Sequence, residues 1–157
     1  MTLIVEKGSG VAGAVSYLAL EEADTHFSAL SHAAWQSAPV GLRENVLRQA
    51  SSYVDFYEYP GAPLSMDQGL KWPRRAAADK DGRILSGLPH ALRSAVLELA
   101  STYIEQPPGS IETRKILKEK VGPLELVYSA SEHQPSFVYR LLLQIGARPR
   151  SNEIVRG

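Results

Sequence analysis

The residues best suited to chemistry form one short cluster in the middle of the chain. Trp72 follows Lys71 and precedes Pro73, Arg74 and Arg75. An aromatic ring between cations is typical of single-stranded nucleic-acid contacts, where bases stack on the ring and phosphates meet the charges. The alternative is that Trp72 fills the core from a long loop while the cations stay in water or pair with carboxylates. We favour this alternative, because one such cluster does not make a groove.

A second candidate is the glycine-rich segment at residues 8–13, GSGVAG, which matches G-x-G-x-x-G directly after a strand-like segment at residues 2–6. A dinucleotide site needs a helix that opens at these glycines, and then a second strand with an acidic residue about twenty positions on. The sequence after Phe27, SALSHAAWQSAPVG, is not a buried strand. We therefore expect a flexible glycine loop and no cofactor.

Other catalytic and metal-binding patterns are missing from the sequence. The four histidines are scattered along the sequence, and we expect each to be a surface or capping residue. No H-E-x-x-H, P-loop or G-x-S-x-G pattern occurs. The acidic residues at 21–24 are better explained as a solvated helix start than as a metal site. The chain has no cysteine, which excludes disulfides, thiolate metal sites and cysteine nucleophiles. We expect no catalytic residues, no metal site and no enzymatic activity.

Composition predicts one domain that does not bind DNA through its overall charge. The chain has 157 residues, with 17 lysines and arginines against 17 aspartates and glutamates. A net charge of zero leaves no general attraction to DNA or to an anionic membrane, so any such contact needs a local patch. The sequence also shows no signal-peptide pattern and no membrane span.

The elements that must position the cluster are mostly helices. The clearest pattern covers residues 87–105, where Leu88, Leu92 and Val96 begin an apolar stripe with the period of a helix. Similar stripes predict helices at residues 20–30, at about 42–57 and at 137–145, although Ala19 is a poor N-cap for the first of them. Residues 60–86 form a long connection that contains the Trp72 cluster.

The remaining segments predict β-structure and a tail. Residues 115–121 and 124–128 have the alternation of a β-hairpin, with a Gly122-Pro123 turn. The fold class is therefore mainly α: a small bundle of about four helices with a β-hairpin at about 115–128, a short N-terminal strand and an extended C-terminal tail. We divide the chain into a helical domain at 1–146 and a C-terminal arm at 147–157, which is either a frayed terminus or an arm that orders on a partner.

Two segments are candidate interfaces with other subunits. A lone hairpin is marginal in water and must pack on helices or pair with another chain. Its candidate contacts are Lys118, Lys120, Leu124 and Leu126. The candidate contacts of the arm are Arg148, Arg150, Ile154, Val155 and Arg156.

An ordered set of short motifs resembles a known family. The motifs are Leu3-Ile4-Val5-Glu6, the loop at residues 8–14, Ser16-Tyr17-Leu18, Leu20-Glu21-Glu22-Ala23-Asp24 with Phe27, Ala34-Trp35, Leu70-Lys71-Trp72-Pro73-Arg74, Leu88-Pro89 and Lys118-Glu119-Lys120-Val121-Gly122-Pro123-Leu124. Together they resemble small neck proteins of tailed phages, often labelled DnaT-like single-stranded-DNA-binding proteins, which are similar to head–tail connector (adaptor) proteins. The resemblance covers nearly the whole chain up to Tyr128.

This resemblance implies a structural protein of the virion neck, made in the host cytoplasm. Such an adaptor forms a ring of about twelve copies beneath the portal protein. The ring extends the DNA channel and docks the next neck or tail-terminator protein. Its partners would be the portal, neighbouring copies and that downstream protein, with DNA only passing through and no membrane contact. The alternative function is a single-stranded-DNA-binding module of DnaT-like type.

Overall fold

The fold follows from a computed structural model, which describes residues 2–108 and 136–150. The hairpin predicted at 115–128 and the last residues of the arm, 151–157, lie outside the described residues. Within them, five helices and one two-stranded sheet occur. They are α1 (Leu20–Ala29), α2 (Ala33–Ser37), α3 (Val40–Val54), β1 (Ala62–Pro63), β2 (Arg74–Arg75), α4 (His90–Glu105) and α7 (Ser136–Leu143).

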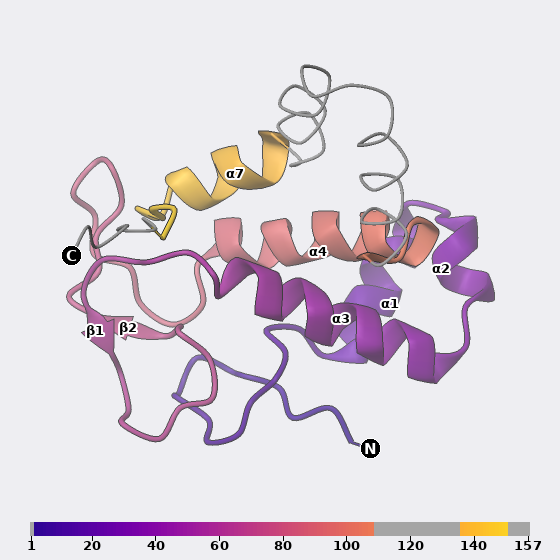
Figure 1. Cartoon of the computed structure of the whole chain (residues 1–157), viewed down its shortest axis with the longest axis horizontal. Helices are drawn as coiled ribbons and strands as arrows, with labels where there is room; N and C mark the ends of the chain where they lie inside the picture. The colour runs from indigo at the N-terminus through magenta and orange to yellow at the C-terminus, as the bar shows by residue number, and fades with distance from the viewer. Residues whose placement is uncertain (1, 109–135, 151–157) are drawn as a thin grey trace, which may run out of the picture.

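Helix α4 is the centre of the bundle. Helix α3 packs along one side of it and α7 along another (Figure 1). Helix α2 also contacts α4, and α1 contacts α2 and α3. The loops that carry β1 and β2 gather at the end of the bundle opposite α2, beside the described part of the C-terminal segment. The predicted mainly α fold class is confirmed.

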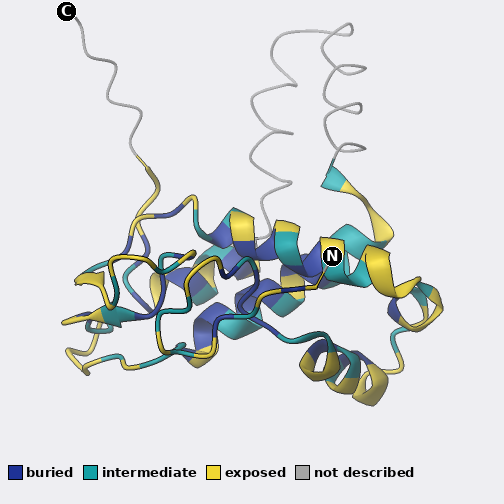
Figure 2. Ribbon diagram, turned by 90° about the horizontal axis from the view of Figure 1, so that it is seen from below, coloured by how far each residue is buried: buried dark blue, intermediate teal, exposed yellow. Residues whose placement is uncertain are grey.

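The core lies between α3 and α4. Leu92, Val96 and Leu99 of α4 are buried, as their helical spacing predicts, and so are Leu47 and Val54 of α3, the helix that packs along α4. Figure 2 shows the buried residues of the chain in dark blue. Each such side chain stabilises the fold by about 1.5–3 kcal/mol relative to an exposed position. Leu42 and Phe137, the first residues of two of the predicted helices, were expected on the apolar faces of those helices but are exposed.

The main difference in the helical part is α2, which the sequence does not predict. Its five residues are too few for a periodic pattern. The helix forms because His32 Nδ1 accepts a hydrogen bond from the Trp35 backbone N–H at 3.2 Å, which caps it. The buried Trp35 then donates from its indole Nε1 to Asp24 in α1 at 2.7 Å. Tertiary packing, rather than local propensity, thus fixes this short helix.

The ends of α1 and α3 depart slightly from the predicted ranges. Ala19 provides no side-chain cap for α1, as expected, and Glu22 instead accepts a hydrogen bond from the Ala19 backbone N–H at 3.0 Å. Helix α3 begins at Val40 and ends at Val54, so Tyr57 lies beyond it.

The long connection at residues 60–86 contains the small sheet. Strands β1 and β2 are antiparallel, with Ala62 opposite Arg75 and Pro63 opposite Arg74. The Trp72–Pro73 peptide bond, just before β2, is cis. Strands of two residues carry no detectable alternation, so this sheet could not be predicted from the sequence.

The two chain ends attach to the body through single bridges. The predicted N-terminal strand is one parallel bridge, between Val5 and Ser16. At the other end, Ala147 is buried, and Glu58 and Arg148 exchange backbone hydrogen bonds at 2.8 and 2.9 Å. The first residues of the proposed arm are therefore joined to the loop that follows α3.

Candidate functional site

Trp72 lies in the core and not on the surface. Its exposed fraction is 0%, and its ring packs edge-on against Tyr59 with the ring centroids 5.6 Å apart. Its backbone N–H donates to the Tyr17 hydroxyl at 3.1 Å. A buried ring offers no face to a nucleic-acid base, so the interpretation of Trp72 as a core residue is confirmed and the stacking role is wrong.

The neighbouring cations hold this loop in place. The Lys71 ammonium donates to the Tyr57 carbonyl at 2.6 Å, and the Arg74 guanidinium donates to the carbonyls of Pro60 and Gly61 at 2.7 and 2.9 Å. These bonds satisfy backbone carbonyls that have no partner in a regular element. Lys71 and Arg74 are therefore structural.

A buried polar pair connects the same loop to the start of the chain. The Tyr17 hydroxyl donates to one oxygen of Asp55, and the Lys71 backbone N–H donates to the other at 3.0 Å. Burial raises the pKa of the Asp55 carboxyl, while both of these hydrogen bonds act in the opposite direction. Burial and the nearby Asp55 carboxylate also raise the pKa of Tyr17. These hydrogen bonds join Asp55, at the end of α3, to the start of the chain and to the loop that carries Trp72.

The buried tyrosines predict a loss of stability at alkaline pH. Burial raises the pKa values of Tyr17 and Tyr59 above the ordinary value of 10.0, at which both ionise in the unfolded chain. Because the folded state keeps protons that the unfolded state loses, their contribution is complete below this pH and falls above it. Above this pH, each tyrosine should lower the free energy of unfolding by about 1.4 kcal/mol per pH unit. Urea titrations at several pH values would measure the slope, and Tyr17→Phe should make it shallower; an equal slope would contradict the assignment.

Three other arginines remain on the surface and meet at one end of the molecule. Arg75 lies opposite Ala62 in the small sheet, Arg148 is bridged to Glu58, and Arg150 follows two residues later. All three are exposed, and within residues 2–108 and 136–150 no ion pair engages them. We call this surface, formed by Arg75, Arg148 and Arg150, the basic end. The sequence assigned Arg75 to the Trp72 cluster and both Arg148 and Arg150 to the C-terminal arm, and only the fold brings the two groups to the same end.

Acidic side chains lie on helices α1 and α4. The exposed acids of α1 are Glu21 and Glu22, and those of α4 are Glu98 and Glu105. Figure 1 places the C-terminal end of α4 away from the loops around β1 and β2, whereas Glu22 faces Arg93 in the first turn of α4. The net charge of zero therefore conceals separate basic and acidic surfaces.

The glycine-rich loop is an anion-binding nest that is already filled. Glu6 is 1% exposed, and its carboxylate accepts hydrogen bonds from four successive backbone N–H groups. Those of Gly8, Ser9 and Gly10 reach Oε1 at 2.9, 3.0 and 3.0 Å, and that of Val11 reaches Oε2 at 2.6 Å. Successive amides of this kind bind phosphate in other proteins. Here they enclose the chain's own carboxylate. The loop, which the sequence suggested to be flexible, is therefore ordered by this contact.

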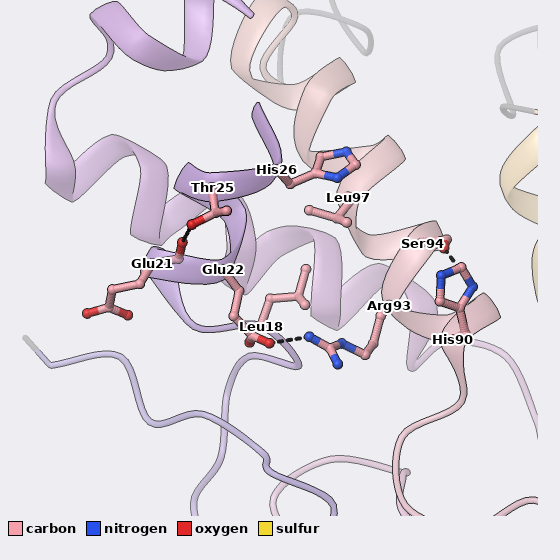
Figure 3. Close-up of a pocket in the computed structure, with 9 residues that line it drawn as sticks. All are labelled: Leu18, Glu21, Glu22, Thr25, His26, His90, Arg93, Ser94 and Leu97. Carbon is pink, nitrogen blue, oxygen red and sulfur yellow. Dashed lines mark hydrogen bonds and ion pairs between the residues drawn. The ribbon is translucent and has the colours of Figure 1, made fainter. Parts of the chain in front are cut away.

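A hollow of about 580 Å³ lies between α1 and α4 (Figure 3). Glu22 and Arg93 reach across it and form an ion pair, while His90 lies 3.4 Å from the Ser94 hydroxyl on the same helix. A second hollow of about 510 Å³, beside the N-terminal segment, shares the same ion pair. Because the central charges neutralise each other, neither hollow favours an anion or a cation at its centre.

Other classes of site gain no support from the described part of the chain. It contains no group of three or more histidine, cysteine, aspartate or glutamate side chains placed to hold a metal ion. None of its helices combines the length and the apolar character needed to cross a bilayer. Of the histidines, His32 caps α2, and His133 lies outside the described residues.

Several candidate interface residues also lie outside the described residues. For the hairpin these are Lys118, Lys120, Leu124 and Leu126, and for the arm Ile154, Val155 and Arg156. Their proposed roles stay predictions.

Comparison with known proteins gives one match. A family model described as "Putative DnaT-like ssDNA binding protein" matches residues 1–157. No curated protein and no solved structure matches the chain. Because the family model spans the whole sequence, the chain belongs to the family that carries this description.

Proposed function

We propose that this protein binds single-stranded DNA. The observation that carries the proposal is the family match over the whole chain. The basic end supports it, because three exposed arginines provide the local patch that a protein of zero net charge needs. Trp72 does not take part, since it is buried.

The test is a titration of the full chain with a fluorescent oligo-dT. Contacts from the three arginines to phosphates should give a slope of log affinity against log salt of about −2, at about −0.7 for each contact. A duplex of the same length should bind more weakly if exposed bases contribute. Absence of binding at low salt would refute this function.

A second candidate is the head–tail adaptor of a tailed phage, located in the virion neck. The ordered motifs of the sequence support it, as do the separate basic and acidic surfaces. In a ring, one surface of each copy contacts a different surface of the next, so surfaces of opposite charge suit such a contact. The proposed partners are the portal protein, neighbouring copies and the next neck or tail protein. Neither candidate function requires catalysis or a cofactor, and we propose that the protein is not an enzyme.

Removal of residues 151–157 tests the adaptor function. Ala147 and Arg148 should be kept, because the first is buried and the second is bridged to Glu58. The shortened chain should keep its helical circular dichroism spectrum and lose its docking to the purified portal. Native mass spectrometry and cryo-EM of the mixture would detect the ring. Undiminished docking would count against a role for the arm.

A further inference from the structure

We propose that Phe56 and the three arginines of the basic end form one contact surface for single-stranded DNA, in which a base stacks on Phe56 and the arginines hold the phosphates. The inference rests on the DNA binding proposed above and adds the site. Nothing in the family match indicates which residues would make the contact.

Phe56 is the most exposed aromatic side chain in the described part of the chain. Its exposed fraction is 67%, compared with 0% for Trp72. A single exposed hydrophobic residue is common on a protein surface, so it is the place of Phe56 in the chain, next to the segment that anchors the arginines, that makes it a candidate. Stacking on a base is sequence-tolerant, because every base has a π-face.

Phe56 directly precedes the segment that anchors the cations. This segment, residues 57–62, contacts both the stretch from Lys71 to Arg75 and the C-terminal segment. Tyr57 accepts a hydrogen bond from Lys71, Glu58 is bridged to Arg148, and Ala62 lies opposite Arg75. These residues span at most about 20 Å of extended chain. The ring and the arginines are thus attached to one short stretch of chain, which is within the reach of a short oligonucleotide.

The surface is also held rigid before any ligand arrives. Asp55, the residue before Phe56, accepts hydrogen bonds from the Tyr17 hydroxyl and the Lys71 backbone. Arg74 fixes Pro60 and Gly61 through their carbonyls. A preorganised surface loses less conformational entropy on binding. The partly buried segment from Lys71 to Arg74 thus supports the DNA surface without being part of it.

One charge on the surface opposes the proposed ligand and so provides a sharp test. Glu58 is exposed and is bridged through its backbone to Arg148. A carboxylate at this place repels phosphates. Glu58→Gln should therefore strengthen oligo-dT binding by roughly two- to fivefold, whereas Glu98→Gln, the same change on the exposed surface of α4, should leave it unchanged.

Two further variants separate stacking from charge. Phe56→Ala should weaken oligo-dT binding roughly 5- to 150-fold with an unchanged salt slope, and Phe56→Tyr should retain the binding. Arg148→Ala should make the slope shallower by about 0.7, while Lys7→Ala, at an exposed cation beside the second hollow, should not. Thermal melting would check that each variant folds.

The outcomes distinguish this inference from the proposed function. Salt-dependent binding of oligo-dT that none of the Phe56, Glu58 and Arg148 changes affects would overturn the site and leave DNA binding in place. No binding by the unaltered protein would overturn both. Equal binding of poly-glutamate, insensitive to Phe56→Ala, would show a simple anion patch and would also overturn the site.

Discussion

Replacing Trp72 with alanine is expected to lower the free energy of unfolding by about 3–5 kcal/mol. The indole is fully buried, and its removal leaves a cavity beside Tyr59, which packs against it. Small domains are stable by only about 5–15 kcal/mol, so this loss takes up a large share of the total. Urea unfolding followed by circular dichroism would measure it.

The indole ring, rather than its N–H group, should be responsible for this effect. Within the described residues, Trp72 Nε1 has no hydrogen-bond partner. Trp72→Phe keeps most of the ring volume and should cost much less than Trp72→Ala, while Phe56→Ala, at an exposed position, should change stability little. A Trp72→Ala protein of normal stability that has lost DNA binding would restore the role of Trp72 as a stacking platform.

The helices were predictable from the sequence because each has a full-length apolar period. Leu92, Val96 and Leu99 recur as a helix requires, and the structure buries all three. By contrast, α2 depends on His32 as its cap and on Trp35 packing against α1, and neither contact appears in a periodic pattern. The small sheet is too short to have a period. What the sequence missed is therefore structure that depends on particular caps and pairings, which leave no periodic pattern in the sequence.

The candidate site shows the same limit more strongly. Local spacing drew attention to Trp72 with its neighbouring cations, and the alternative of a core residue could already be favoured from its size. The basic end could not be found this way, because Arg75 and Arg148 are distant in sequence and meet only through the segment after α3. The one sequence signal for the proposed DNA surface was Phe56, an aromatic residue near the end of the helix predicted at about 42–57. Phe56 does not belong to the apolar stripe of that helix, so helical periodicity does not single it out.

Replacing Glu6 with alanine is expected to destabilise the protein by on the order of 3 kcal/mol. Four backbone N–H groups lose their shared acceptor, and each charge-assisted bond of this kind contributes about 1.5–3 kcal/mol when it is made. The total is smaller than their sum because water can reach the exposed Ser9. Glu6→Gln should also destabilise, since its amide group would present N–H donors to the Val11 N–H. Urea unfolding of both variants would measure the losses.

The origin of this loss can be tested by returning an anion to the nest. Acetate supplies the missing carboxylate, and an anion that binds only the folded state raises its stability by mass action. Acetate should therefore stabilise Glu6→Ala more than chloride does at equal ionic strength, and it should have no such effect on Trp72→Ala, whose nest is intact. Because the amides point at the place that the Glu6 carboxylate occupies, the rescue should fall with larger anions that cannot enter it. If Glu6→Ala is as stable as the unaltered chain, the loop does not depend on its carboxylate, and its glycines must serve another purpose than enclosing that group.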